Sequence, residues 1–194
     1  MINETAKQKQ LRITARSLFW KHGIKRVTIE EICQQASVSK ATFYKFFKNK
    51  NALILHMLNY LFEEALSEYT TISTSNSPYP AKVEAIISMK IKIAKEMSAE
   101  LFSELYVYPD PEIQKFLMEA SNNTMQLVLN DLKSAQLKGE IRKELKPEFI
   151  MWYLNKLVDL VKDETLFQFF DNTDDIIKAV LTLFYQGIVS PEKK

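Results

Sequence analysis

The sequence predicts an all-α fold, and three observations support that prediction. Apolar residues recur at helical spacing over long segments, strict alternation of apolar and polar residues is sustained nowhere, and only 3 glycines and 6 prolines occur among 194 residues. Nearly all of these breakers lie at the ends of periodic segments or between them: Gly23, Gly139, Gly187, Pro78, Pro80, Pro109, Pro111, Pro147 and Pro191. Each glycine is expected to close a helix in a left-handed conformation.

The first helices can be placed from their caps. One is expected from about Glu4 to His22. A short helix is expected after Thr28, because the Thr28 hydroxyl can cap its first turn. Glu31 stands three residues later, at the capping-box position. A second short helix is expected after Ser39.

The remaining helices are longer. One is expected from about Asn49 to Tyr69, followed by a loop at Thr70–Pro80, which is rich in Ser, Thr, Asn and Pro. Four further helices are predicted: Ala81–Tyr108, Pro111 to about Lys138 (either continuous or broken near Asn122–Asn123), Pro147–Lys162 and about Asn172–Gln186.

Composition limits the class of protein. With 46% hydrophobic and 26% charged residues, the chain is globular rather than disordered. Its apolar runs are far shorter than the ~20 residues that span a bilayer, and Met1 opens a polar stretch rather than a signal peptide. The single cysteine, Cys33, excludes an internal disulfide. We therefore expect a cytoplasmic protein without a membrane partner.

Charge is divided unevenly along the chain. Residues 1–54 hold 11 Lys/Arg and 3 Asp/Glu, a net charge of +8, whereas residues 55–194 hold 15 and 21, a net charge of −6. The two parts sum to the formal +2 of the whole chain. This asymmetry predicts a basic module that meets a polyanion, attached to a body that does not.

The basic module contains a candidate helix-turn-helix. Its two short helices are joined by Ala36-Ser37-Val38, with apolar residues such as Ile32 and Phe43 facing inward. The outward side chains on the second helix and just after it are rich in hydrogen-bond donors: Lys40, Thr42, Tyr44, Lys45, Lys48 and Lys50. A short helix with small and cationic residues on its outer face fits a DNA major groove of ~12 Å.

These residues form a recognisable pattern. It reads Ala15-x-x-Leu18-Phe19-x-x-x-Gly23, then Val27-Thr28-Ile29-x-x-Ile32, then Ala36-x-Val38-Ser39-Lys40-Ala41-Thr42-Phe43-Tyr44-x-x-Phe47-x-x-Lys50-x-x-Leu53. The pattern closely resembles the TetR family of bacterial transcriptional regulators. A weaker similarity covers Gly139-x-Ile141-Arg142-x-x-Leu145-x-Pro147-Glu148, which in that family leads into two helices that pair across a dimer.

Two positions depart from the family pattern. Ser37 stands where the family usually has glycine in the turn, and a left-handed non-glycine residue costs ~1–2 kcal/mol. Ala41 stands where glycine is also frequent. Neither departure removes a donor to phosphate or base.

The resemblance implies roles for individual residues on DNA. Thr28, Tyr44 and Lys50 are expected to contact phosphates. Lys40, Thr42 and Lys45 are expected to reach base edges, with Lys40 able to donate to guanine. The full DNA-binding set is Thr28, Ser39, Lys40, Thr42, Tyr44, Lys45, Lys48 and Lys50. The alternative for each lysine is an ordinary solvated face.

The C-terminal helices are too apolar for a single buried stripe. A helix that is apolar on most of its circumference is covered on more than one side. One side is therefore expected to pack into the body and the other against a second copy, in a four-helix homodimer interface. The expected interface residues are Leu154, Leu157, Val161, Val180 and Phe184. The alternative is a fully internal core helix.

The resemblance also implies a small-molecule pocket in the body. Flexible methionines and broad aromatic side chains suit a permissive apolar site, although ordinary core is the more common role of any one of them. The candidate lining is Met89, Met97, Phe102, Tyr106, Phe116, Met125, Trp152, Tyr153 and Phe167. Glu96, Glu100 and Glu104 follow one another at helical spacing, either as a solvated stripe or as carboxylates facing a cationic ligand.

The resulting hypothesis is a helix-turn-helix DNA-binding domain at residues 1–50, joined through the helix of residues 49–69 to an effector-binding and dimerisation domain at residues 51–194. It predicts a homodimeric repressor, released from an inverted-repeat DNA operator by a small apolar or amphipathic effector. Only His22 and His56 could serve as histidine ligands or bases, and neither lies in a catalytic or metal motif. We expect no enzyme, cofactor or metal. The alternatives are a helical small-molecule carrier and a constitutive DNA binder.

Overall fold

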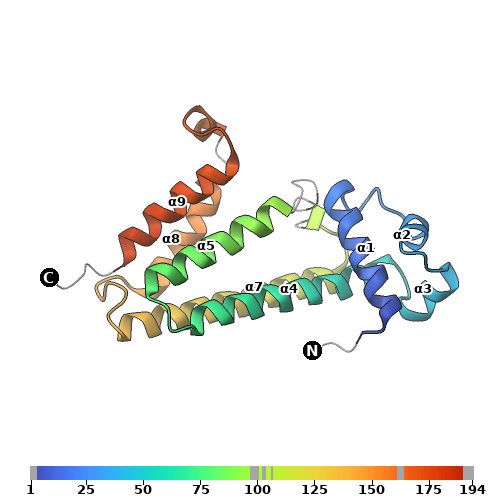
Figure 1. The fold of residues 1–194 in the computed structure, drawn as a ribbon, viewed down its shortest axis with the longest axis horizontal. Coiled ribbons are helices and arrows are strands. Elements are labelled where there is room, and N and C mark those ends of the chain that lie inside the picture. The colour runs from blue at the N-terminus through green and yellow to red at the C-terminus, as the bar shows by residue number, and fades with distance from the viewer. Residues whose placement is uncertain (1–3, 97–100, 102–103, 106, 161–163, 190–194) are drawn as a thin grey trace. The chain divides into compact units, whose positions relative to one another are not determined.

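The computed structural model describes residues 4–96, 101, 104–105, 107–160 and 164–189. Over these residues the regular structure is helical, apart from one isolated bridge between Ile141 and Val189. The all-α prediction is confirmed. The elements in Figure 1 are α1 (Ala6–His22), α2 (Ile29–Gln35), α3 (Lys40–Phe46), α4 (Lys50–Thr74), α5 (Tyr79–Glu96), α7 (Pro111–Leu137), α8 (Pro147–Leu160), the short 3-10 helix η1 (Glu164–Gln168) and α9 (Thr173–Ile188).

The chain divides into two compact units, each with its own apolar core. The first comprises Met1–Ser67 and Glu96–Ser121, and the second comprises Glu68–Lys95 and Asn122–Lys194. This division differs from the expected boundary at residue 50. The reason is that the first turns of α4 bury apolar side chains, such as Leu53, in the core of the first unit.

The caps expected from the sequence are present. Thr28 accepts a hydrogen bond from the Glu31 amide at 3.1 Å, and Ser39 accepts one from the Thr42 amide at 3.1 Å. Gly23 has a φ of 75° at the end of α1, as expected for a residue that closes a helix. These signals are local in sequence, which is why the pattern alone placed α1, α2 and α3 closely.

The two glycines beyond α4, Gly139 and Gly187, have different positions relative to the helix ends. Gly139 has a φ of 76° after α7, in agreement with the prediction. The prediction that Gly187 closes a helix is wrong, because Gly187 lies within α9, which continues to Ile188. Hydrogen-bonded helix geometry is available to glycine as it is to other residues, so its presence alone does not end a helix.

The predicted loop at Thr70–Pro80 is also wrong over most of its length. Helix α4 continues to Thr74 and α5 begins at Tyr79, so the connection is residues 75–78. The hydroxyls of Ser73 and Thr74 donate to the carbonyl of Thr70 at 3.3 and 2.7 Å. These side chains thus find acceptors on the helix itself, and their composition gave a misleading loop signal.

The helices on either side of residue 110 also refine the prediction. The helix expected over Ala81–Tyr108 corresponds to α5, whose bounds are Tyr79–Glu96. Residues 107–110 are not helical. Asp110 caps the next helix by accepting from the Glu112 and Ile113 amides at 3.0 and 3.1 Å. Helix α7 then runs without a break through Asn122–Asn123.

The core of the first unit fixes the positions of α1, α2 and α3, which lie together in blue to cyan in Figure 1. The fully buried side chains at its centre include Phe19, Ile24, Ile32 and Phe43. They come from α1, α2, α3 and the turn between α1 and α2. The inward-facing apolar residues expected of a helix-turn-helix are therefore packed as predicted.

A buried ionic cluster connects the start of α1 to α4. Arg12 donates to both carboxylate oxygens of Glu4, at 2.9 and 3.1 Å, and the His56 ring nitrogen lies 2.9 Å from the same carboxylate. The Arg12 guanidinium also lies 3.9 Å from the centre of the Tyr60 ring. Burial acts to raise the pKa of Glu4, but the hydrogen bonds from Arg12 and His56 outweigh it and hold that pKa below its usual value.

Replacing Ser37 by glycine should stabilise the first unit. Ser37 has a φ of 52°, a left-handed conformation that a side chain disfavours. Relief of that strain, less the extra chain entropy of glycine, gives an expected gain of about 0.5–1 kcal/mol in the free energy of unfolding. Urea titration measures it.

The matched control is Ser121→Gly, on the exposed face of α7. There the same change should cost about 0.5 kcal/mol, because glycine lowers helix propensity. Destabilisation by Ser37→Gly of the same size as the control would contradict the strained turn.

Candidate nucleic-acid interface and ligand cavity

Helix α3 presents its polar side chains outward because its apolar ones hold it in place. Phe43 is fully buried and its ring lies 5.6 Å from that of Phe47. On the opposite side Lys40, Tyr44 and Lys45 are exposed, and Tyr44 has 55% of its surface accessible. The structure thus leaves exposed three of the α3 side chains that the sequence assigns to DNA contact.

The hydroxyl groups assigned to DNA also shape the helix ends. The Ser39 hydroxyl lies 2.9 Å from that of Thr42, besides capping α3. Thr28 caps α2 in the same way. A hydroxyl that accepts from an amide still carries its own proton, so Thr28 keeps a donor for an acceptor such as phosphate. Ser39 and Thr42 share one hydroxyl hydrogen bond, which leaves one donor between them.

Lys40 forms an exposed ion pair with Glu30 of α2, at 2.8 Å. The hydrogen bond to Glu30 raises the pKa of Lys40 above its ordinary value, so its ammonium is charged at neutral pH. Exposed pairs of this kind are strongly screened. A phosphate or a base edge can therefore compete with Glu30 for the ammonium.

Lys50 differs from the other lysines. Its ammonium is partly buried and donates to the backbone carbonyls of Ile24 and Val27, at 2.8 and 2.9 Å. Burial lowers the pKa of Lys50, and the nearby Glu104 opposes that shift. Two of its three N–H donors are thus used within the protein, which leaves one for the phosphate contact implied by its place in the motif.

Glu104 binds backbone amides of the same turn, between α1 and α2. Its carboxylate accepts from the amides of Ile24 and Lys25, the second at 3.1 Å, and only 8% of the residue is exposed. The prediction that Glu104 lies on a solvated stripe or faces a ligand is therefore wrong. The side chains of Glu96 and Glu100 lie outside the described residues.

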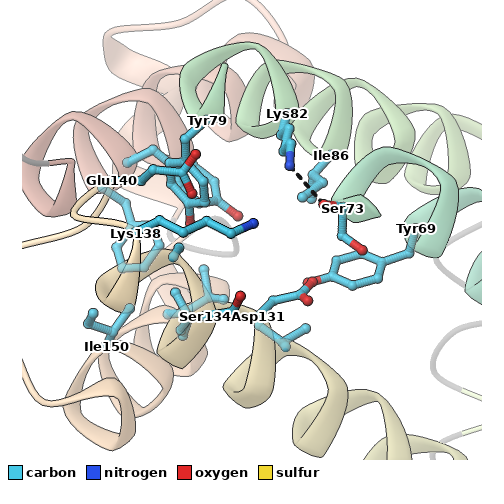
Figure 2. Close-up of a pocket in the computed structure, with 16 residues that line it drawn as sticks. Tyr69, Ser73, Tyr79, Lys82, Ile86, Asp131, Ser134, Lys138, Glu140 and Ile150 are labelled. Carbon is cyan, nitrogen blue, oxygen red and sulfur yellow. Dashed lines mark hydrogen bonds between the residues drawn. The ribbon is translucent and has the colours of Figure 1, made fainter. Parts of the chain in front are cut away.

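The second unit contains a cavity of about 60 Å³, shown in Figure 2. That volume has room for roughly four to six water molecules at ~10–15 Å³ each. Side chains from α4, α5, α7, α8 and α9 line it, among them Tyr69, Tyr79, Lys82, Asp131, Leu154 and Tyr185. Its wall is a mixture of aliphatic side chains and a concentrated set of polar ones.

The polar groups of the cavity are unequally satisfied. Lys82 donates to the carbonyl of Ser73 at 2.9 Å, the dashed line in Figure 2. The Tyr69 hydroxyl is hydrogen-bonded to Asp131, but the other carboxylate oxygen, Oδ2, is buried and has no hydrogen-bond partner. Burial raises the pKa of Tyr185 to about 12. An unpaired buried carboxylate oxygen is uncommon in proteins and calls for a donor.

Five of the nine residues that the sequence assigned to a ligand pocket are described, and they do not line this cavity. Met89 is buried away from the cavity lining, Phe116 packs against the core of the first unit, and Met125, Trp152 and Tyr153 are exposed. Met97, Phe102, Tyr106 and the Phe167 side chain lie outside the described residues. Sequence reasoning missed Tyr69, Tyr79, Asp131 and Tyr185. No local signal marked Tyr69 or Tyr79, because Tyr69 stands between Glu68 and Thr70 and Tyr79 between two prolines.

The helices α8 and α9 carry an exposed apolar surface. We call it the α8/α9 face: Phe149, Trp152, Tyr153 and Leu183, each 44–73% exposed. The Phe149 ring stacks on those of Trp152 and Tyr153, with centres 6.1 and 6.2 Å apart. A groove of about 360 Å³ lies along this face.

Three of the expected interface residues, Leu157, Val180 and Phe184, line that groove. Leu157 and Phe184 are buried within the chain, and Leu154 and Val180 are half-buried. Val161 lies outside the described residues. A helix that is apolar on most sides does not reveal from its sequence which side remains uncovered.

Comparison with known proteins agrees with this geometry. The sequence model for bacterial regulatory proteins of the tetR family matches residues 13–57, which include α2, α3 and the start of α4. Residues 13–57 are therefore similar to the N-terminal part of the regulatory proteins of that family. An uncharacterized HTH-type regulator of Bacillus subtilis (strain 168), YuxN, is 36% identical over 76 residues, or 39% of this chain. The chain spans about a quarter (26%) of the length of that curated relative.

Solved structures extend the similarity over the whole fold. A Saccharomonospora viridis protein, described as a transcriptional regulator and crystallised with choline, has a TM-score of 0.79 and 14% identity, over 97% of this chain and 100% of that one. SCO4454, a TetR-family transcriptional regulator from Streptomyces coelicolor, has a TM-score of 0.72 and 20% identity, over 93% of each chain. At these identities the comparison establishes a TetR-like fold alone.

The residues that the structure describes lack two features. None of their helices has the length and apolar character required to cross a membrane. Within the same residues, no three histidine, cysteine, aspartate or glutamate side chains are grouped so that they could hold a metal ion.

Lys50→Met should destabilise the TetR-like domain. Methionine keeps the apolar stem but leaves the Ile24 and Val27 carbonyls without their donor, at an expected cost of about 1–3 kcal/mol. Thermal or urea unfolding measures it. The matched control is Lys48→Met, whose ammonium is exposed and lies 4.0 Å from Glu112, and which should change stability by less than about 0.5 kcal/mol. Equal effects from the two variants would show that the Lys50 bonds contribute little.

Proposed function

We propose that the protein is a DNA-binding transcriptional regulator that acts as a homodimer. The observation that carries this proposal is the exposed donor face of α3 within a domain that matches the TetR family. A net charge of +8 over residues 1–54 adds a long-range attraction to DNA. Repression at an inverted-repeat operator is the mode that the family resemblance suggests.

In this proposal α3 enters the major groove and its neighbours hold the phosphates. Lys40, Thr42 and Lys45 are the candidates for base edges, because they lie along the outward side of α3. Tyr44, Lys48 and the capping hydroxyls of Thr28 and Ser39 are the candidates for phosphates. The remaining donor of Lys50 adds a contact of secondary weight.

The α8/α9 face is the proposed dimer interface. Four large apolar side chains exposed on adjoining helices form the kind of patch that a monomer rarely leaves in water. A second copy related by two-fold symmetry would cover the face with the same residues. Leu154 and Val180, half-buried at its side, would become covered as well.

The small cavity of the second unit is the proposed effector site. The Saccharomonospora viridis protein of similar fold was crystallised in complex with choline, which supports a small-molecule ligand for this fold. An effector releases the regulator from DNA only if it binds the DNA-incompetent arrangement more tightly. We expect the effector to be amphipathic, because the cavity combines an aliphatic wall with polar groups.

The test of DNA binding starts with selection of bound duplexes from a random pool. Affinity for the selected DNA, measured by fluorescence anisotropy, should fall with salt at a log–log slope of ~−0.9 per phosphate neutralised. Lys48→Ala in a dimer removes two proposed phosphate contacts, so the slope should flatten by roughly two units. The matched control is Lys143→Ala, an exposed lysine of the second unit, which should leave the slope unchanged. A slope near zero for the unaltered protein would refute the proposal.

The test of the dimer uses an exposed leucine, so that folding is preserved. Leu183→Asp places a charge on the α8/α9 face and should convert a dimer to a monomer in sedimentation velocity. Leu137→Asp alters a leucine that is 87% exposed at the end of α7, outside that face, and should leave the dimer intact. A dimer that survives Leu183→Asp would place the interface elsewhere.

A further inference from the structure

We propose that the cavity of the second unit binds a small primary or secondary alkylamine in its protonated form, with the ammonium on Asp131 and the alkyl group against the aliphatic wall. Binding itself needs only the second unit. The role of that amine as an effector rests on the proposed function.

The first argument is the unpaired oxygen of Asp131. Its Oδ2 atom is buried and has no hydrogen-bond partner, while the carboxylate is also hydrogen-bonded to Tyr69. A buried carboxylate oxygen left in this state is unfavourable, and an N–H donor with a positive charge satisfies both its hydrogen bond and its charge. A quaternary ammonium offers no N–H, so the geometry favours an amine that has one.

The second argument is that the lysines of the cavity do not supply this donor. The Lys82 ammonium is hydrogen-bonded to the carbonyl of Ser73. Lys138 is exposed, although its side chain extends toward the cavity in Figure 2, and Asp131 Oδ2 has no partner among the described residues. Glu140 provides a second carboxylate that can offset the charge of Lys138.

The tyrosines extend the polar part of the site. Burial raises the pKa of Tyr79, and the neighbouring Asp131 and Glu140 raise it further. The same combination of burial and the Asp131 carboxylate acts on Tyr69. These hydroxyls remain neutral, and their environment disfavours additional negative charge. A cation is the complementary ligand.

The rest of the cavity sets the size of the ligand. Its volume of about 60 Å³ corresponds to a molecule of roughly four to six non-hydrogen atoms, if each takes the space of one water. Ile86, Val128, Leu154 and Phe184 supply an apolar wall for an alkyl chain. A linear amine of about four carbons therefore matches both parts of the cavity.

The experiment compares three probes of equal chain length on the full chain: n-butylammonium, n-butanol and butyrate. Titration calorimetry at neutral pH should give saturable binding of n-butylammonium, at least about 10-fold tighter than that of either other probe. Equal binding of butanol and butylammonium, tighter binding of butyrate, or no saturable binding of butylammonium would each overturn the proposal. This comparison uses the unaltered protein and does not depend on any variant folding.

A pair of variants then assigns the ammonium to its partner. Asp131→Asn keeps the shape but removes the charge, and it should weaken butylammonium binding at least about 10-fold. Asp171→Asn, an exposed aspartate that does not line this cavity, is the control and should bind as the unaltered protein does. Unchanged affinity in Asp131→Asn would overturn the assignment.

A parallel titration with the selected DNA separates this proposal from the proposed function. Butylammonium binding without any DNA binding upholds the amine site and refutes the regulator. DNA binding without amine binding refutes the amine site and leaves the regulator standing. If both bind, saturating butylammonium should raise the dissociation constant for DNA, and an unchanged constant would refute the effector role of the amine.

Discussion

Two charged side chains hold the turn between α1 and α2, and the positions of α2 and α3 depend on them. Glu104 accepts from the amides that follow Gly23, while Lys50 donates to the carbonyls of Ile24 and Val27. A turn after a helix leaves backbone groups without helical partners, and burial makes those groups costly unless they are paired. Because Lys50 and Glu104 pair them with full charges, the turn is held at two points and α2 starts from a fixed position.

The bonds of Lys50 connect the turn to α4, one of two helices with residues in both units. Lys50 is the first residue of α4, whose later residues Tyr69 and Ser73 line the cavity. Helix α7 likewise buries Ile113 in the first core and carries Asp131 at the cavity. Both helices therefore carry residues of the first core and residues of the cavity.

The sequence predicted features whose determinants are neighbours along the chain. The caps at Thr28 and Ser39, the turn at Gly23 and the outward face of α3 all follow from residues within one or two helical turns. The cavity and the bonds of Glu104 depend on residues far apart in sequence, and no local pattern brings them together. The apolar character of α8 and α9 indicated covering on several sides. Which side stays open is decided by packing, so Leu157 and Phe184 are buried while Leu183 is exposed.

The proposed ligand at Asp131 acts on α4 through Asp131 itself, which already connects α7 to Tyr69 of α4. The carboxylate is hydrogen-bonded to Tyr69 of α4. An ammonium ligand on its other oxygen also lies against residues of α5 and α9 that line the cavity. The arrangement of α4 that best satisfies this additional partner gains population in proportion to the difference in binding free energy. If that arrangement moves Lys50, the carbonyls of the turn lose their donor or follow it, and α3 moves with them. In the proposed regulator DNA selects the opposite arrangement, and it must then weaken ligand binding by the same factor.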